Sequence, residues 1–299
     1  MASFFDEIAR NRLKSSLLMA VFAAFFIGVI YLFALYVGLG IYGIAVAVIL
    51  VAIYGMFTYY TGDKFVLKMS GAKPADKPSN KVLFDTVEGL AVANQLPVPK
   101  VYIINDPSPN AFATGRDKKH SSIAVTSGLL SMMDRDELQG VLAHEMSHIY
   151  DNDIMFMLVA VVFAGAIGII AGFVRMSMFF GGIGGGRNEN AGLIVLIALI
   201  IGLLAPFFAL LIRLAISRRR EYMADANGAR ITRDPKGLAD ALRKIQSYTK
   251  NPQAQGVKKA NEVTAPLYFS NPLSVRSMAN IFSTHPPIGE RIKKLEAMY

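Results

Sequence analysis

The sequence contains no cysteine and no tryptophan, and only four of its 299 residues are histidines. Without cysteine, the chain can form no disulfide and no thiolate-ligated zinc site, and it has no thiol nucleophile. Charged residues are also scarce, at 18% of the chain, whereas hydrophobic residues make up 53%. This balance is typical of a protein with several membrane spans and a modest polar domain.

The net charge of +9 arises from 31 Lys and Arg against 22 Asp and Glu. An excess of this size can indicate nucleic-acid binding, but the basic residues cluster beside the apolar runs. In that position they act as topological signals and as contacts for anionic lipid. We therefore expect the lipid bilayer, and no nucleic acid, as a partner.

Four apolar runs are long enough to cross a bilayer at about 20 residues per span. They cover residues 17–37, 41–59, 154–180 and 191–216. The positive charges lie on the outer flanks of each pair, so the rule that positive charges stay inside places the polar segments in the cytoplasm. The alternative for the third and fourth runs is an apolar hairpin that packs within the protein or inserts only partly.

The segment His144-Glu-Met-Ser-His148 follows the HExxH pattern. If residues 134–153 are helical, the two imidazoles lie one turn apart on one face and can bind a single metal ion. Glu145 is then placed to contact a metal-bound water, where a general base for hydrolysis belongs. The alternative is that both histidines are ordinary surface or core residues of an amphipathic helix. The polar run 134–139 before the motif predicts that it lies at a water-exposed edge.

A catalytic zinc (Zn2+) usually takes a third protein ligand and keeps one position open for water. The metzincin pattern is excluded, because Asp151 and Ile154 stand where it needs Gly and His. The best third ligand is Glu221, far downstream. Asp225, one helical turn later, can accept the other ring N–H of a ligand histidine. Considered alone, Glu221 fits better as a surface carboxylate paired with Arg218 or its neighbours, and the HExxH motif is what favours the ligand.

These features divide the chain into four parts. Residues 1–61 hold the first hairpin of spans, and residues 154–216 hold the second. Residues 62–153, with the HExxH helix, and residues 217–299, with the third ligand, form the two halves of one cytoplasmic domain. The metal would then lie at the cytoplasmic mouth of a four-span bundle.

A small sheet is predicted beside the HExxH helix. Strands are expected at residues 100–104, 111–114 and 121–126, after a helix over 80–95. Residues 110–115 are the candidate edge, where an extended substrate can add by backbone hydrogen bonds; an ordinary hairpin strand fits equally well. Downstream, a helix is expected over 234–250 and a surface loop over 251–271 that can cover the cleft.

His285 is followed by two prolines and a short basic helix. A histidine at this place can stabilise the charged tetrahedral intermediate of hydrolysis. A solvent-exposed histidine at the start of a helix fits the sequence equally well.

With HEMSH at 144–148, EYMAD at 221–225 and THPP at 284–287, the chain resembles the HtpX family of membrane zinc metalloproteases, relatives of the Ste24-type CAAX proteases. The resemblance covers nearly the whole chain. It implies an α-helical membrane protein with four transmembrane helices and an α+β gluzincin-type protease domain. It also implies an inner-membrane endopeptidase of bacterial or archaeal type, which acts on the cytoplasmic side on unfolded or misfolded membrane proteins in quality control.

The resemblance assigns roles by position. His144, His148 and Glu221 match the zinc ligands of the family, Glu145 matches its catalytic base, and Asp225 matches the acidic residue that supports a metal-binding histidine. The stretch Asn110, Ala111, Phe112 and Ala113 matches the region that pairs with substrate. His285 lies in the C-terminal motif.

The rival interpretation is a non-enzymatic membrane scaffold or a transporter with a structural zinc. Transport pathways usually need several ionisable residues within the membrane, and these spans hold only Arg175 and Arg213, both toward their ends. A structural zinc tends to have four protein ligands, whereas the sequence offers three good candidates.

Overall fold

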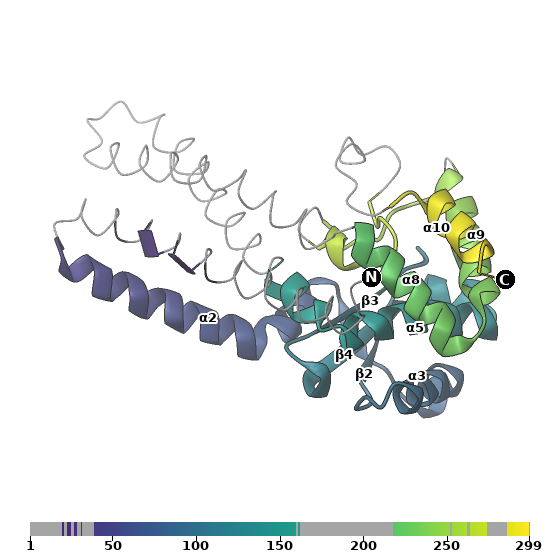
Figure 1. The fold of residues 1–299 in the computed structure, drawn as a ribbon, viewed down its shortest axis with the longest axis horizontal. Coiled ribbons are helices and arrows are strands. Elements are labelled where there is room, and N and C mark those ends of the chain that lie inside the picture. Colours follow the sequence, from purple (N-terminus) through teal and green to yellow (C-terminus); the bar gives the residue numbers. More distant parts are fainter. Residues whose placement is uncertain are drawn as a thin grey trace, which may run out of the picture. The chain divides into compact units, whose positions relative to one another are not determined.

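The computed structural model describes residues 39–159, 161, 218–251, 253–261, 264–273 and 286–298, with six single residues between 20 and 31 (Figure 1). The chain forms two compact units, Met1–Thr61 with Ala166–Pro206, and Gly62–Gly165 with Phe207–Tyr299. Three of the predicted spans lie largely or wholly outside the described residues: 17–37, 154–180 and 191–216. The number of four transmembrane helices therefore stays a prediction.

Helix α2 (Tyr42–Met69) carries the second predicted span. It is the one helix within the described residues that is long and apolar enough to cross a membrane. Large apolar side chains along it, among them Ile49, Ile53 and Phe57, are exposed. An exposed apolar face of this size marks a surface that contacts lipid or another protein.

Helix α2 extends beyond the predicted span, which ends at residue 59. The chain stays helical to the end of α2, because Val66 and Leu67 are buried and extend the helix into the second unit. Gly71 then takes a left-handed φ of 71°, a conformation that glycine adopts without a steric penalty and that ends helices. The short strand β1 (Ala72–Pro74) follows.

The sheet has four strands in the order β1-β2-β4-β3. The other three are β2 (Lys100–Ile104), β3 (Ala111–Gly115) and β4 (Ser121–Thr126), at the positions predicted from the sequence. β2 and β4 are parallel, and the outer pairs are antiparallel. β3 is therefore an edge strand, as predicted.

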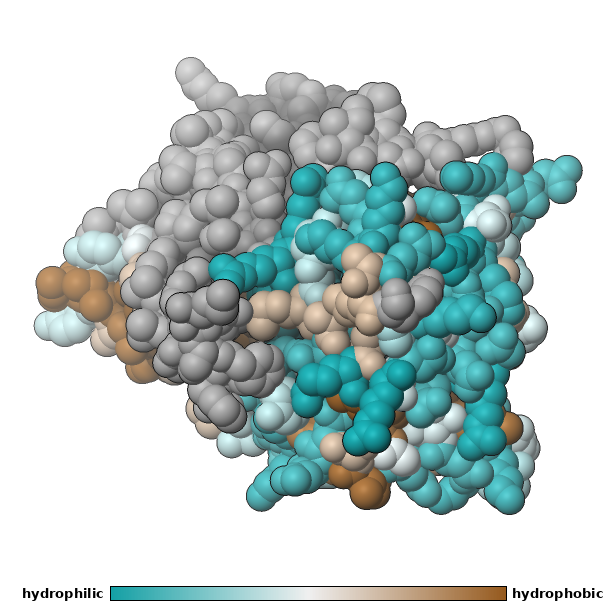
Figure 2. All heavy atoms as spheres, turned by 45° about the vertical axis from the view of Figure 1, so that its right-hand side comes forward, coloured by the Kyte–Doolittle hydropathy of each residue, from teal (hydrophilic) through white to brown (hydrophobic). Residues whose placement is uncertain are grey.

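The remaining helices build the layer beside the sheet (Figure 1). They are α3 (Lys81–Ala93), α4 (Ser127–Met132), α5 (Arg135–Tyr150), α8 (Arg218–Thr232), α9 (Pro235–Lys250) and α10 (Ile288–Glu296). Three 3-10 turns lie between these elements: η1 (Pro78–Asn80) between β1 and α3, η2 (Lys118–His120) between β3 and β4, and η3 (Ala265–Leu267) between α9 and α10. The visible face of this unit is predominantly hydrophilic (Figure 2).

Helix α5 carries the HExxH motif and begins with a capping box. The side chain of Asp134 accepts from the backbone N–H of Glu137 at 2.9 Å, and the Glu137 carboxylate accepts from the N–H of Asp134 at 2.9 Å. This reciprocal pair satisfies two backbone donors that would otherwise lack partners at the helix start. The structure thus confirms the predicted start of the helix at residue 134, where the polar run begins.

Helix α5 is buried on nearly all sides, since α3, α8, α9 and β3 pack around it. Two glycines allow this close packing: a Cβ on Gly140 would lie 2.7 Å from the backbone nitrogen of Leu238, and one on Gly228 would lie 3.1 Å from that of His144. The expectation of a water-exposed motif is therefore wrong. The polar residues before the motif reach the surface, but the motif lies in the core.

The surface loop expected over 251–271 is also wrong in its last part. After η3, the side chains of Tyr268, Phe269 and Ser270 are buried. This segment has an irregular backbone, so its apolar residues show no helical or strand period and the sequence gives little sign of their burial.

Candidate active site

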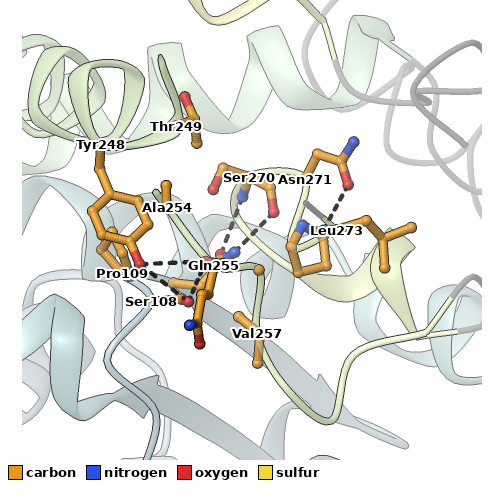
Figure 3. A pocket seen from close by; sticks show the side chains of 13 residues that line it. Ser108, Pro109, Tyr248, Thr249, Ala254, Gln255, Val257, Ser270, Asn271 and Leu273 are labelled. Atoms are coloured by element: carbon orange, nitrogen blue, oxygen red, sulfur yellow. Dashed lines mark hydrogen bonds between the residues drawn. The ribbon is translucent and has the colours of Figure 1, made fainter. Parts of the chain in front are cut away.

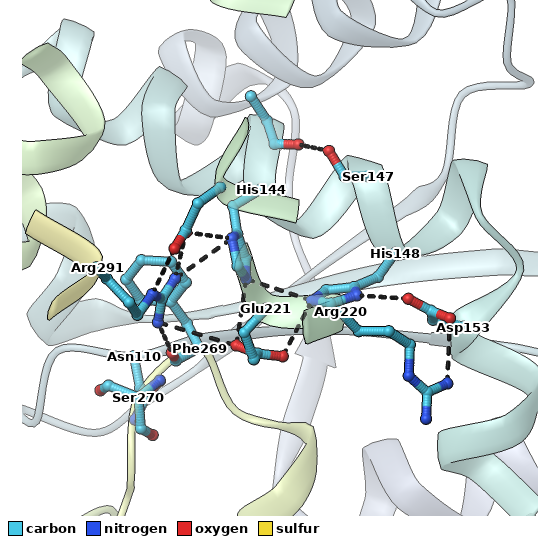
Figure 4. A network of polar contacts seen from close by, with 12 residues as sticks. Asn110, His144, Ser147, His148, Asp153, Arg220, Glu221, Phe269, Ser270 and Arg291 are labelled. Atoms are coloured by element: carbon cyan, nitrogen blue, oxygen red, sulfur yellow. Dashed lines mark hydrogen bonds and ion pairs between the residues drawn. The ribbon is translucent and has the colours of Figure 1, made fainter. Parts of the chain in front are cut away.

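The structure brings together the three residues proposed as metal ligands (Figure 4). His144 and His148 lie one turn apart on α5, and their Nε2 atoms are 3.3 Å apart. Glu221 reaches the pair from α8, with carboxylate oxygens 3.8 Å from Nε2 of His144 and 3.6 Å from Nε2 of His148. All three side chains are buried.

This arrangement fits a metal ion. In a tetrahedral site with bonds of about 2.0–2.1 Å, neighbouring donor atoms lie about 3.3 Å apart. The three donors are 3.3–3.8 Å apart in the structure. Two imidazole nitrogens and one carboxylate form the donor set of catalytic zinc sites, which leave a fourth position open.

Each histidine is oriented by a carboxylate on its other ring nitrogen. Nδ1 of His144 lies 2.9 Å from Oδ1 of Asp225, and Nδ1 of His148 lies 3.2 Å from Oδ2 of Asp153. A carboxylate at Nδ1 fixes the tautomer and leaves Nε2 available to a metal. The structure thus places Asp225 where the sequence predicted it, and it adds Asp153.

Asp153 reaches His148 through a sharp turn after α5. Asn152 has a φ of 58°, in the left-handed region that asparagine tolerates better than most residues. The chain therefore reverses locally and brings the carboxylate of Asp153 back to the histidine, where Arg220 also bonds to it at 3.2 Å.

The most extensive support for the site comes from Arg291 on α10, which is 1% exposed. Its guanidinium donates to both carboxylate oxygens of Asp225 at 2.9 and 2.7 Å, and lies 3.3 Å from Nδ1 of His144. Burial alone would raise the pKa of Asp225, but the charge of Arg291 holds it well below its usual range. Asp225 therefore stays ionised and fixed against the histidine.

The two histidines differ in protonation. Burial lowers the pKa of His144 to about 4. Burial also acts to lower that of His148, but the hydrogen bond to Asp153 and the charge of Glu221 raise its pKa to about 9. A metal binds only the neutral ring nitrogen, so metal binding at neutral pH would release a proton from His148.

Glu145 lies beside the metal ligands and next to strand β3. Burial and the nearby charge of Glu221 raise its pKa to about 7. The backbone of Ala113 on β3 lies close to its carboxylate and acts to lower the pKa. The structure therefore places a carboxyl group with a near-neutral pKa between the ligand cluster and the edge strand.

A segment from the C-terminal half of the chain lies along the other part of β3. We call residues 268–270 the edge segment. The N–H of Phe269 donates to the carbonyl of Ala111 at 2.8 Å, and the side chain of Asn110 bonds to both the carbonyl and the N–H of Ser270. The predicted substrate residues Asn110 and Ala111 are thus paired within the protein.

The edge segment is firmly held by its aromatic side chains. The ring of Tyr268 packs against Phe112, and that of Phe269 packs between His144 and the guanidinium of Arg291. An aromatic side chain buries about 150–250 Å2, so at about 25 cal/mol per Å2 the exposure of each ring costs roughly 4–6 kcal/mol. Displacement of both rings is therefore strongly unfavourable.

Three contributors to the site were missed from the sequence: Asp153, Arg291 and Phe269. Of these three, only Asp153 could have been found from the sequence, because it is an acidic residue shortly after the second histidine. Arg291 reads as one of several basic residues on a surface helix. His285, proposed to stabilise the reaction intermediate, lies outside the described residues.

Replacement of His148 by alanine should abolish tight metal binding, because two of the three donors cannot hold the ion in place. The measurement is the metal content of the purified protein after dialysis. His120→Ala is the matched control: His120 is exposed and bonds only to Asp117 among the interactions given by the structure, so metal content should stay unchanged. Equal metal content in the two variants would contradict the ligand assignment.

Two histidines one turn apart, a glutamate from a second helix and a buried glutamate beside an edge strand are the arrangement of a metalloprotease. Peptidase family M48 matches residues 78–299, and the chain belongs to this family.

Related proteins match this chain over nearly its whole length. The chain is 47% identical to a protease HtpX homolog of Caldanaerobacter subterraneus, covering 99% of this chain and 98% of that protein. It is 44% identical to a protease HtpX homolog of Dictyoglomus thermophilum, covering 99% and 95%. Helix α2, which is long and apolar enough to cross a membrane, fits a membrane protein.

A solved structure shows the same fold at lower identity. The crystal structure of Ste24p from S. mikatae matches 97% of this chain and 67% of that protein, with a TM-score of 0.53 and 19% sequence identity. The small mixed sheet and the surrounding helices therefore form the fold of this family.

Proposed function

We propose that the protein is a membrane-bound zinc endopeptidase that hydrolyses peptide bonds of misfolded or damaged membrane proteins on the cytoplasmic side. The observation that carries this proposal is the position of Glu145. Its carboxylate lies beside the His144, His148 and Glu221 cluster and next to the backbone of Ala113 on the edge strand. A general base, a metal site and a surface for an extended peptide thus meet at one place.

Zinc is the ion that suits the donor set best. Two imidazoles and one carboxylate are a catalytic zinc set, whereas magnesium and calcium prefer oxygen ligands alone. When bound, zinc lowers the pKa of a coordinated water to about 7 and polarises a carbonyl group.

The residues of the chain supply proton transfer and positioning. Glu145 accepts the proton of the attacking water and returns it to the leaving amine. Asp225 and Asp153 keep the two histidines oriented through Nδ1. Arg291 holds Asp225 in place. His285 belongs to the proposal as a further group that stabilises the oxyanion.

The proposed substrates follow from how the edge strand recognises a chain. Backbone pairing depends on an extended main chain and only weakly on side chains, which suits unfolded polypeptides of many sequences. The exposed apolar face of α2 supports a place in the bilayer, where misfolded membrane proteins are within reach. The distribution of Lys and Arg supports several spans and a cytoplasmic active site.

Removal of the metal tests the proposal. The purified protein in detergent should contain about one zinc per chain and cleave an unfolded membrane protein. A chelator should stop the cleavage, and added zinc should restore it while magnesium should not. Cleavage that persists in protein shown to be free of zinc would refute the zinc mechanism. A zinc-loaded protein that cleaves no unfolded polypeptide would favour a structural metal.

A further inference from the structure

Strand β3 has one edge inside the sheet and one edge outside it. The N–H of Thr126 on β4 donates to the carbonyl of Asn110. Pairing alternates along an antiparallel strand, so the backbone groups of Phe112 and Thr114 also point toward β4. Those of Ala111, Ala113 and Gly115 point to the outer edge, which no strand of the described sheet covers.

The edge segment takes up the outer edge at one end of β3. It pairs with Ala111 through the N–H of Phe269, and Ser270 closes a two-way bond with the side chain of Asn110, at 2.9 and 3.2 Å (Figure 4). A peptide on the outer edge can pair with Ala113 and Gly115. It meets the edge segment when it reaches Ala111.

This barrier is fixed by several independent contacts. Tyr268 and Phe269 are each 1% exposed. The carbonyl of Phe269 accepts from Arg291 at 3.0 Å. The edge segment is therefore held on both faces. Strand β3 contacts one face through Ala111 and Phe112, together with Asn110 just before it, and α10 contacts the other.

A small hollow lies beside the edge segment. A hollow lined by Ser108, Asn110, Tyr248 and Ser270 has a volume of about 20 Å3 (Figure 3). A cavity of this size holds about one water molecule. This hollow therefore offers no room for a further peptide residue.

We propose that the edge segment limits backbone pairing of the substrate to about two residues on the carboxyl side of the cleaved bond. The backbone of Ala113 lies beside the carboxylate of Glu145, so the reacting carbonyl lies near that residue, and Ala111 is about 7 Å further along the strand. Antiparallel pairing is the more stable mode, and it directs the carboxyl side of the substrate toward Ala111. Recognition therefore extends on the amino side, along Gly115, and the carboxyl side of a longer chain turns away from β3.

The inference rests on the proposed peptidase function, and nested peptides test the two separately. Cleavage sites in an unfolded polypeptide, reduced and carboxymethylated casein, are first mapped by mass spectrometry with the full-length protein in detergent. Peptides around one site are then shortened from either end. Loss of a pair of backbone hydrogen bonds on the amino side should lower kcat/KM by about tenfold. Loss of residues beyond the second on the carboxyl side should change it by less than about twofold.

The outcomes separate clearly. Equal losses from both ends, or a larger loss on the carboxyl side, would overturn the inference while leaving the peptidase function intact. The absence of any cleavage would overturn the proposed function, and the inference with it.

Two variants test whether the edge segment causes the difference in kcat/KM between shortening the peptide from its amino end and from its carboxyl end. Ser270→Pro lacks the N–H that bonds to Asn110 and should loosen the barrier, so residues further along the carboxyl side should begin to affect kcat/KM. Ser270→Ala keeps both backbone bonds and should retain the wild-type asymmetry. An active Ser270→Pro variant with unchanged asymmetry would show that another part of the chain sets the limit.

Discussion

Glu145→Gln should lower peptide cleavage by about 10²–10⁴-fold and leave metal binding intact. Glutamine keeps the size of the side chain, but it cannot take up a proton from water. The metal ligands His144, His148 and Glu221 are unchanged. The variant therefore separates proton transfer from metal binding.

The measurement combines zinc content with cleavage of an unfolded membrane protein in detergent. Glu137→Gln is a matched control on the same helix, because Glu137 is also buried and glutamine can serve in the capping box at its position. That variant should retain both zinc and activity. Cleavage by Glu145→Gln, with contaminating proteases removed, would exclude Glu145 as the base.

Arg291→Met should destabilise the protein by about 3–5 kcal/mol, because it leaves Asp225 as a buried charge without its partner. Metal affinity should fall by about 10–100-fold, since the carboxylate that orients His144 is no longer held. The measurements are thermal unfolding of the metal-free protein and competition for zinc with a chelator of known affinity.

A second variant distinguishes a positioning role from a loss of stability alone. Arg291→Met combined with Asp225→Asn removes both charges and leaves an amide oxygen for Nδ1 of His144. Unfolding should then require more free energy than in the single variant, while zinc affinity stays reduced. If zinc affinity recovered together with stability, Arg291 would be a structural residue with no specific role at the metal site.

The part of the site that follows a local pattern could be predicted from the sequence. His144 and His148 are four residues apart on one helix, and helical geometry alone places them together. Strands β2, β3 and β4 also follow local patterns and lie where they were expected. Glu221 could be proposed as a ligand only from a second motif elsewhere in the chain. Its contact with the histidines depends on how α8 packs on α5.

The contacts that depend on tertiary packing could not be predicted. Arg291 is separated by 66 residues from Asp225 and by 147 from His144. Nothing in the local sequence of α10 distinguishes this buried arginine from its exposed basic neighbours. The burial of the HExxH motif was missed for a similar reason. The polar residues before the motif lie at the exposed end of α5, whereas the motif itself is buried by α8 and α9, which pack against it.

The position of Arg291 on α10 bears on the timing of activity during synthesis. A ribosome adds about 5–20 residues per second, and domains form from the N-terminal side. The 147 residues between His144 and Arg291 therefore take roughly 7–30 s to make. During that interval the newly made protease lacks the arginine that holds Asp225 in place, so a cell is not exposed to a fully assembled active site on an unfinished chain.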